Sequence, residues 1–359
     1  MYNFNAGPSI LPQQVIIQAS EAVLNFNNTG LSLLEIGHRT PAFEQVMHTA
    51  QNLVKELMGL HSDYEVLFLH GGATTQFMQV PFNLLPSQGV AAYTDTGVWA
   101  HKAIQEAQHY GKVHVVSSSR EHGYTYIPKN ITIPSQASYI HITSNNTIYG
   151  TQWHSSEAYT QAGVPIVADM SSDIMSRVLD YNAYGLIYAG AQKNMGAAGV
   201  NVVIINKNIL GKANRHIPTI LDYKEHIDNG SMLNTPPVMA VYIAMLTLQW
   251  IKDSGGIAAM EVLNNQKAAL LYNTIDSSTM YTGTVTAVED RSKMNVCFTL
   301  PNKDLEAKFI ATCTAANIVG IKGYRTVGGC RVSLYNALPL SSVQYLVGIM
   351  SQFELDNKM

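Results

Sequence analysis

The sequence predicts an α/β fold in two parts, a large part built on a largely parallel β-sheet and a smaller α+β part. From about residue 65 to residue 206, short apolar runs of strand length alternate with helix-like stretches. This alternation favours strands joined by crossovers, with helices on both faces of the sheet. The last hundred residues instead mix two strands with two helices, and 359 residues are enough for two domains.

Two amphipathic helices are predicted before the sheet. Pro12 can open the first, because apolar residues recur after it at three- and four-residue spacing: Val15, Ile16, Ala19, Val23 and Phe26. Pro41 can open the second helix, and Gly59 can end it.

Seven apolar runs are predicted as strands of the sheet: residues 65–70, 90–94, 113–117, 138–143, 165–169, 185–190 and 200–205. Stretches such as 99–110 are predicted to be helices that connect the strands. Later in the chain we expect helices at 238–253 and from there to about Ile275, strands at 294–300 and 331–335, and helices near 303–317 and 341–356. We therefore predict a large domain over residues 11–255 and a small domain made of residues 256–359 together with an arm, residues 1–10.

The charge balance argues against nucleic acid as a partner. The chain has 22 basic and 25 acidic residues, a net charge of −3, and no basic block that would bind a phosphate backbone. Charged residues make up only 13% of the chain, against about 25% in an average protein. Such a low share favours burial of part of the surface against another subunit, although it can also reflect lineage.

Membrane insertion, secretion and metal binding are not encoded by any clear signal. No apolar run approaches the ~18 residues of a membrane helix, and no basic residue precedes Arg39, so a cytoplasmic location is expected. The three cysteines, Cys297, Cys313 and Cys330, have no CxxC spacing. They are interpreted as reduced core residues, with neither a disulfide framework nor a metal site.

Ligands of open parallel sheets bind beyond the carboxyl ends of the strands, so the residues that follow each strand are candidates for a site. The run His70-Gly-Gly-Ala-Thr-Thr-Gln-Phe77 leads from a strand into a helix through glycines, and free N–H groups there can hold a phosphate. A tight turn would use the same residues. The GxGxxG fingerprint of dinucleotide binding is absent.

Asp169 and Lys193 each follow a predicted strand, and together they suggest a specific chemistry. Lys193 is the only charged residue between Asp180 and Lys207, and it lies among glycine and alanine. Such a lysine can lose its proton and form a Schiff base. A carboxylate on the neighbouring strand end is what the ring nitrogen of a pyridine cofactor requires. With the phosphate-binding run, the two residues predict a pyridoxal-phosphate (PLP) site, where Trp99 could stack on the ring.

Six motifs along the chain carry a family resemblance: NFNAGPSILP at the start, GHRTPAF at 37–43, HGGATTQF at 70–77, YAGAQKN at 188–194, NGSMLNTPP at 229–237 and KGYRTVGGCRVSLYNALP at 322–339. They closely resemble the phosphoserine aminotransferase family of class-V aminotransferases, in the right order over essentially the whole chain. The resemblance implies a cytoplasmic homodimer of the aspartate-aminotransferase-like fold (fold type I) with shared active sites and PLP as cofactor. It also implies reversible amino transfer from L-glutamate to 3-phosphohydroxypyruvate, giving O-phospho-L-serine in serine biosynthesis, and an additional activity on 4-phosphohydroxy-L-threonine in vitamin B6 synthesis.

The resemblance also implies roles for particular residues. Lys193 would carry PLP as a Schiff base, and Asp169 would pair with the ring nitrogen. Six further residues would bind the cofactor, the last two from the partner subunit: Ala73, Thr74 and Gln192 at the phosphate, Trp99 and Thr147 at the ring, and Asn234 and Thr235 at the phosphate again. The substrate's distal anion would meet His38 and Arg39, with Arg325 from across the interface, and its α-carboxylate would meet Arg331.

Two departures from the family pattern concern the substrate phosphate. Some members carry an arginine where Thr74 stands and a histidine where Tyr324 stands, so phosphate affinity and substrate range are open. Two rival functions make different demands on the sequence. A lyase or desulfurase of the same fold would need a mobile nucleophilic cysteine, and the three cysteines do not fit that role. A binding protein without catalysis would not need intact Lys193 and Asp169.

Overall fold

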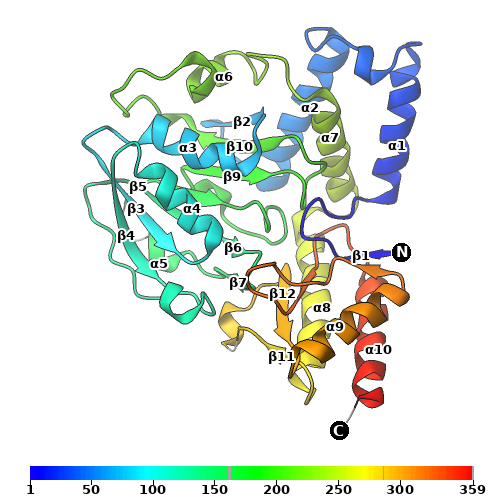
Figure 1. Ribbon diagram of the computed structural model, residues 1–359. Helices are drawn as coiled ribbons and strands as arrows, with labels where there is room; N and C mark the ends of the chain where they lie inside the picture. The colour runs from blue at the N-terminus through cyan, green and yellow to red at the C-terminus, as the bar shows by residue number, and fades with distance from the viewer. Residues whose placement is uncertain (161–162, 286, 358–359) are drawn as a thin grey trace.

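The computed structural model describes residues 1–160, 163–285 and 287–357, and its centre is a seven-stranded sheet (Figure 1). The strand order is β2-β10-β9-β8-β5-β3-β4. The strands have these bounds: β2 Tyr64–Leu69, β3 Val90–Asp95, β4 Lys112–Ser118, β5 Ala137–Thr143, β8 Ile166–Asp169, β9 Leu186–Gly190 and β10 Asn201–Asn206. The seven predicted strands are all present, and the α/β fold class is confirmed.

One strand of the sheet runs against the others. β10 pairs antiparallel with both β2 and β9, whereas the remaining neighbours pair in parallel. The reason is the length of the preceding connection. β9 ends at Gly190 and β10 begins at Asn201, and a parallel crossover needs a dozen residues or more. The short antiparallel link between these two strands contains Lys193.

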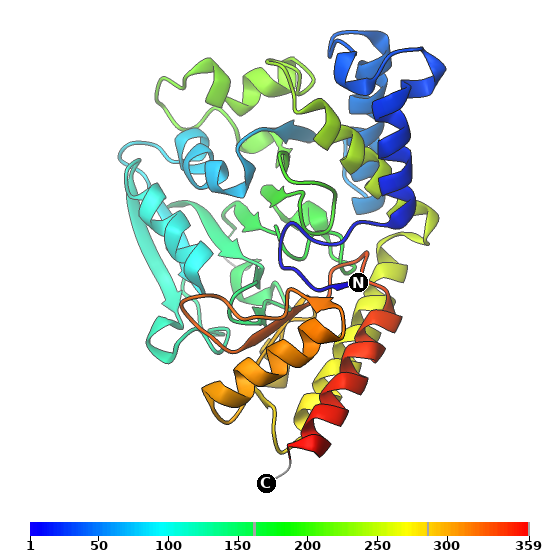
Figure 2. The ribbon, with the colours of Figure 1, turned by 45° about the vertical axis from the view of Figure 1, so that its right-hand side comes forward.

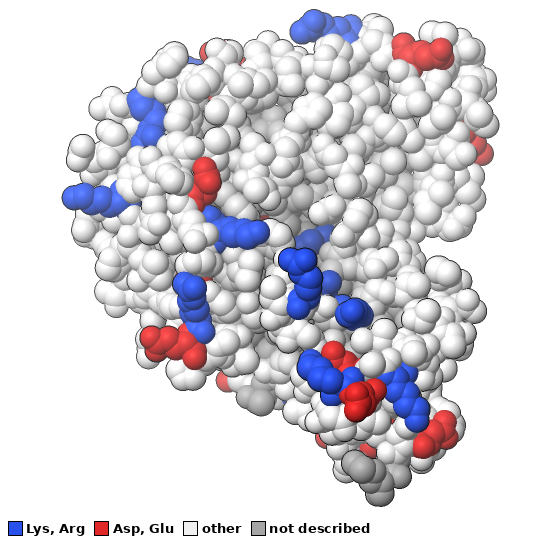
Figure 3. All heavy atoms as spheres, in the orientation of Figure 1, with Lys and Arg blue, Asp and Glu red and all other residues white. Residues whose placement is uncertain are grey.

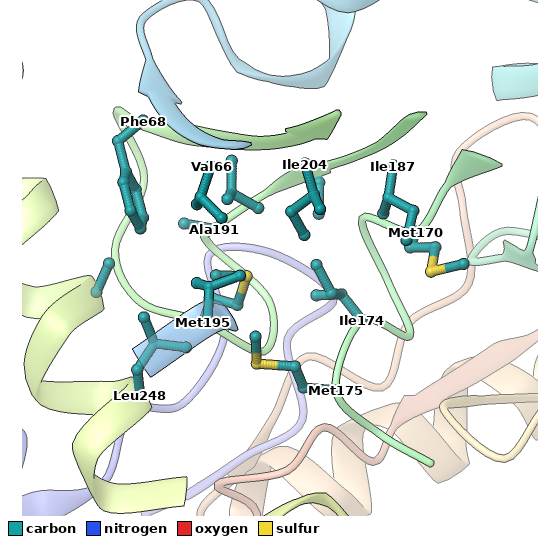
Figure 4. Packing of buried hydrophobic residues seen from close by; sticks show 14 of the residues in the cluster. Val66, Phe68, Met170, Ile174, Met175, Ile187, Ala191, Met195, Ile204 and Leu248 are labelled. Carbon is teal, nitrogen blue, oxygen red and sulfur yellow. The ribbon is translucent and has the colours of Figure 1, made fainter. Parts of the chain in front are cut away.

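Helices cover both faces of the sheet, as the sequence predicts. On one face, α3 (Gly72–Leu84) and α4 (Val98–Ala107) pack against strand residues such as Leu67, Tyr93 and Tyr188. On the other face, α2 (Pro41–Met58) and α7 (Val238–Asp253) cover the alternate strand residues, with α1 (Gln13–Leu24) packed on α7. Figure 4 shows this second core, where Val66, Ile187 and Ile204 point from the sheet toward a layer that includes Met195 and Ile174, with Leu248 of α7 at its edge.

Parts of the sequence prediction were wrong. Ile16, placed on the buried stripe of α1, is 47% exposed, and Phe26 lies in a separate 3₁₀ turn, Phe26–Asn28. The alternation of strand and helix also weakens after β4: among the described residues, the four-residue α5 (Glu157–Thr160) is the only α-helix between β4 and β9, beside two 3₁₀ turns. The predicted helix 303–317 ends at Ala315, and the predicted strand 331–335 covers residues 330–333.

The small part of the molecule packs three helices against a three-stranded antiparallel sheet. Its elements are α8 Gly256–Asp276, α9 Lys303–Ala315, α10 Leu340–Asp356, β11 Thr282–Gly283, β12 Asn295–Thr299 and β14 Cys330–Ser333. Further short elements include β6 Asn145–Asn146, β7 Thr151–Gln152 and α6 Tyr223–Asp228. No described helix is long and apolar enough to cross a membrane.

The N-terminal arm joins this small part (Figure 2). β1 (Tyr2–Asn3) pairs in parallel with β13 (Ile318–Val319), and Phe4 is fully buried in the core of the small part. These contacts support the predicted grouping of residues 1–10 with 256–359, whose boundaries stay a prediction.

Replacing Phe4 tests how much this arm contributes to stability. Phe4→Ala should lower the free energy of unfolding by about 3–5 kcal/mol, because it removes a fully buried ring from a packed core. Urea unfolding followed by tryptophan fluorescence would measure the loss. Leu355→Ala on α10 is the matched control, since Leu355 is 60% exposed. Equal midpoints for both variants would show that the arm adds nothing to the core.

Candidate active site

A cavity of about 310 Å³ opens at the carboxyl ends of the parallel strands. The sheet register brings the strand ends together there, because Thr143 of β5 lies beside Asp169 of β8. The walls are supplied by segments far apart in the sequence: residues 71–74, Phe77, Trp99, Thr143, Asn145, Thr147, Asp169, residues 171–172, Gly190, residues 192–193 and residues 198–200. Figure 3 shows basic side chains grouped around the hollow in the middle of this face of the molecule.

The turn from β2 into α3 forms one end of the cavity. Gly71 and Gly72 both have a positive φ, 90° and 63°. A Cβ atom on Gly71 would lie 1.9 Å from the Thr75 hydroxyl oxygen, so only glycine fits. No side chain caps α3, and Ala73 and Thr74 in its first turn line the cavity. The uncapped N–H groups and the helix dipole favour an anion at this position.

Asn201, which the sequence did not single out, stabilises the backbone just before this turn. Its side-chain amide donates hydrogen bonds to the carbonyl oxygens of Leu69 and His70, at 3.0 and 2.9 Å, and the residue is fully buried. The bonds fix the last residues of β2 before the glycines. A polar residue at the head of the apolar run VNVVII was the signal that could have identified it.

Lys193 reaches the cavity from the link between β9 and β10. Its Nζ donates a hydrogen bond of 2.8 Å to the hydroxyl of Thr147. Burial lowers the pKa of Lys193 to about 8, against the opposing effect of the Asp169 charge, and the positive charge of Arg331 adds to the lowering. The neutral amine is therefore accessible near physiological pH, as a nucleophile or a proton acceptor requires.

Asp169 lies on the floor of the cavity at the end of β8 and is 5% exposed. Burial raises the pKa of its carboxyl group, and hydrogen bonds from Ser171 oppose that effect. One carboxylate oxygen accepts the Ser171 backbone N–H at 2.9 Å. Within the described part of the chain, no basic side chain forms an ion pair with Asp169, so the site has room for a cationic group of a ligand.

A second buried carboxylate, Asp173, lies close enough to affect the pKa of both Asp169 and Lys193. It was also missed by the sequence analysis. Its own partners satisfy it: the hydroxyl of Ser144, the Gln152 amide at 3.1 Å, and Arg177 at 3.4 Å. Because these bonds occupy both oxygens, Asp173 supports the site rather than offering a ligand position.

The backbone around Lys193 is held by the N-terminal arm. The Ser9 hydroxyl donates to the Lys193 carbonyl at 2.5 Å, and the Ser9 N–H donates to the Gln192 carbonyl at 3.0 Å. The Ala6 carbonyl accepts the Tyr335 hydroxyl at 3.0 Å. The arm thus connects the lysine link to the small part of the molecule, a role that the sequence of the arm did not reveal.

The predicted cofactor residues of this chain are brought together only in part. Seven of them line the one cavity: Ala73, Thr74, Trp99, Thr147, Asp169, Gln192 and Lys193. Asn234 and Thr235 do not line it and are exposed, and the Thr235 carbonyl contacts the His70 ring nitrogen at 2.7 Å. Their predicted contact with a cofactor phosphate needs a second copy of the chain and stays a prediction.

The predicted substrate residues lie outside the cavity wall. Arg331 of β14 is half-buried, and its Nε is buried with no hydrogen-bond partner among the described residues. The same holds for Nε2 of His38, while Arg39 and Arg325 are exposed. Unpartnered buried donors are costly, and an anionic substrate would satisfy them.

PLP fits this donor set. An uncapped helix N-terminus suits its phosphate, a buried unpaired carboxylate suits its protonated ring nitrogen, and a desolvated lysine suits its aldehyde. Metal binding has no comparable basis, since no group of three His, Cys, Asp or Glu side chains in the described residues is placed to hold an ion.

Comparison with known proteins identifies the family. The family model for aminotransferase class V matches residues 1–346. A phosphoserine aminotransferase from Flavobacterium psychrophilum is 54% identical over 359 residues, which is 100% of this chain and 99% of that protein. The chain belongs to the phosphoserine aminotransferases of class V.

Solved phosphoserine aminotransferases have the same fold. That of Bacillus circulans subsp. alkalophilus superimposes with a TM-score of 0.95 at 42% identity, covering 99% of this chain and 98% of the other. The PLP-bound enzyme of Trichomonas vaginalis gives 0.90 at 33% identity, covering 98% and 99%. The predicted fold type I is confirmed, and PLP is the cofactor that class V implies.

The buried carboxylate gives a stability test of the site in the cofactor-free protein. Because the folded-state pKa of Asp169 is raised, the charged form destabilises the fold once the pH exceeds the unfolded value of about 4. Asp169→Asn should therefore raise the free energy of unfolding by about 1–3 kcal/mol at pH 8, and the gain should disappear near pH 4. Thermal unfolding across this pH range would measure it. The exposed Asp228→Asn is the control, and an equal or lower stability for Asp169→Asn at pH 8 would contradict the assignment.

Proposed function

We propose that this chain catalyses PLP-dependent amino transfer between L-glutamate and 3-phosphohydroxypyruvate, giving 2-oxoglutarate and O-phospho-L-serine. The observation that carries the proposal is the placement of Lys193 and the unpaired buried Asp169 in one cavity with the uncapped N-terminus of α3. The 54% identity with a phosphoserine aminotransferase supports the choice of substrates.

PLP, when bound, supplies a conjugated ring that takes up electrons from the α-carbon of the substrate. Asp169 would hold a proton at the ring nitrogen, which makes the ring a better electron acceptor. Ala73 and Thr74, with Gln192, would bind the phosphate. Trp99, half-buried in the first turn of α4, would stack on the ring.

Lys193 would hold the cofactor covalently and later move the proton. With its pKa lowered to about 8, the freed Nζ can accept a proton from the substrate α-carbon and release it near neutral pH. Thr147 orients the amine through its 2.8 Å hydrogen bond. When the amine holds the cofactor, the Thr147 hydroxyl would instead form a hydrogen bond with the ring hydroxyl of the cofactor. The Ser9 contact keeps the backbone of Lys193 in place during both steps.

Arginines would bind the anionic ends of the substrates. Arg331 would receive the α-carboxylate, consistent with its unpartnered Nε and its electrostatic effect on Lys193. His38 and Arg39, with Arg325 from a partner subunit, would receive the phosphate or the glutamate side chain. Guanidinium groups bind both anions through paired N–H donors.

The complete site would need a homodimer. Asn234, Thr235 and Arg325 are exposed and do not line the cavity of their own chain, which supports contributions across an interface. The low charged share of 13% agrees with a large buried surface. The cytoplasmic location and the additional activity on 4-phosphohydroxy-L-threonine remain predictions, and the latter would use the same arginines.

Desulfurase chemistry is disfavoured by the state of the cysteines. All three are buried, and burial raises the pKa of the Cys297 and Cys313 thiols to about 12. Burial also raises the pKa of Cys330. A thiol held neutral in this way is a poor nucleophile at physiological pH.

Replacement of the lysine tests the proposal directly. Lys193→Ala should lower the turnover of glutamate with 3-phosphohydroxypyruvate by at least about a hundredfold, because the proton carrier is lost. It should also lose the yellow colour of a lysine-linked cofactor. Formation of 2-oxoglutarate and the visible spectrum would be measured, with the exposed Lys112→Ala as control. Wild-type turnover in Lys193→Ala would refute the proposed function.

Substrate choice tests the role of Arg39. With the neutral Thr74 and Tyr324 near the expected phosphate position, Arg39 would carry much of the anion recognition. Charge-assisted hydrogen bonds contribute about 1.5–3 kcal/mol. Arg39→Leu should therefore reduce kcat/KM for 3-phosphohydroxypyruvate roughly ten- to a hundredfold, and far less for unphosphorylated hydroxypyruvate. Arg39→Lys should restore part of the loss. Equal losses with the two keto acids would assign Arg39 to structure or to the α-carboxylate.

A further inference from the structure

A second and larger cavity, about 700 Å³, lies between α8 and the segments 177–179 and 288–293. It has no lining residue in common with the cavity that contains Lys193. Cavities of this size hold small organic molecules in many proteins. Nothing in the proposed amino transfer uses this cavity.

Two basic side chains in the cavity have unused binding capacity. Lys293 is half-buried, and its ammonium group forms no ion pair or hydrogen bond with any described residue. Arg177 is 8% exposed and donates from Nη2 to the Trp153 carbonyl, while its Nε is buried without a partner in the described chain. The contact of Arg177 with Asp173 is long, at 3.4 Å. Lys293 can accept an anion without giving up a bond, and Arg177 adds its positive charge while it keeps its contacts with Asp173 and Trp153.

Most of the other charged side chains of the lining already have partners within the chain. Arg291 and Asp276 form a bidentate pair at 2.6 and 2.9 Å. Glu261 accepts the Val178 N–H at 3.2 Å, and Glu289 is exposed at the rim. Glu261 and Glu289 keep their negative charges, so the lining has as many acidic as basic side chains, and the positive charge that an anion could meet is local to Lys293 and Arg177.

The pKa of His154, in the cavity wall, is affected by the positive charges of nearby basic side chains. Burial lowers its pKa to about 4, and the charges of Arg177, Lys293 and Lys129 lower it further. The ring keeps one fixed contact, between Nε2 and the Arg291 carbonyl at 2.8 Å. His154 stays neutral at physiological pH and does not compete for an anion.

The rest of the lining favours an apolar body with one hydrogen-bond donor. The ring of Tyr272, Leu179 and Ala268 supply apolar wall, and Val288 at the rim is 72% exposed. Oδ1 of Asn265 is buried and has no donor among the described residues. A ligand that offered a hydroxyl or N–H group would satisfy this acceptor.

We propose that this cavity is a second binding site, for a small amphipathic carboxylate that also carries a hydroxyl or N–H donor. The carboxylate would lie at Lys293 and Arg177, the donor at Asn265, and the apolar body against Tyr272. The proposal is independent of the amino-transfer function.

Binding of 3-hydroxybenzoate to the PLP-loaded protein tests this proposal, because this compound combines the three features and cannot be transaminated. Titration calorimetry should show a binding event that 3-hydroxybenzamide, the neutral analogue, lacks. The benzoate without the hydroxyl group should bind more weakly, since Asn265 would stay unpaired.

Substitutions in the cavity test whether 3-hydroxybenzoate binds there. Lys293→Gln should weaken binding by at least about tenfold through the lost charge-assisted bond, and Ala269→Phe should abolish it by filling the cavity from the exposed side of α8. Lys112→Gln, at an exposed lysine on β4, is the matched control and should bind as wild type. Circular dichroism and thermal unfolding would show that each variant is folded.

Arg331→Leu separates this site from the active site, where a carboxylate could also bind. Binding that persists in Arg331→Leu and is lost in Lys293→Gln supports the proposal. Binding that is lost in Arg331→Leu and unchanged in Lys293→Gln, or no binding at all, overturns it. Turnover of Lys293→Gln at the wild-type rate would leave the proposed function intact in either case.

Discussion

The burial of a lysine and a carboxylate in one cavity is the constraint on which the rest of the site depends. Each group alone would be costly to remove from water, and each lowers the cost of the other, because their charges oppose the desolvation of Lys193 and of Asp169. Neither is fully compensated in the chain itself. The remaining imbalance would favour the binding of a cationic ring at Asp169, and it leaves Lys193 with a pKa lowered to about 8.

The sheet and its supports fix the positions of these two groups. Parallel pairing aligns the ends of β5, β8 and β9. The short antiparallel link between β9 and β10 places Lys193 at the same edge of the sheet, where it lines one cavity with Asp169. Asn201 and Ser9 then hold the flanking backbone through hydrogen bonds to carbonyl oxygens. Such bonds restrict the backbone without occupying the cavity, which is what a pre-organised site requires.

A buried polar network links this site to the small part of the molecule. Asn145 in the cavity wall donates to Asn295 of β12 at 2.8 Å, Asn295 donates to the Tyr335 hydroxyl at 3.2 Å, and Tyr335 donates to Ala6 of the arm at 3.0 Å. Satisfied networks of this kind are rigid and tolerate little change. They explain how segments from the start, middle and end of the chain form one site.

The sequence by itself determined the α/β class, the seven strands of the central sheet and the long helices, because periodicity and glycines are local signals. It also predicted that Lys193 and Asp169 share one site, and both line the same cavity. The tertiary structure alone decided the direction of β10, the exposure of Ile16, and the supporting roles of Ser9, Asn201 and Asp173. These depend on contacts between residues far apart in the chain, for which a single sequence carries no pattern. The cavity at Lys293 also depends on the tertiary structure, since its lining residues come from four separate parts of the chain that only folding brings together: His154 and the segments 177–179, 261–276 and 288–293.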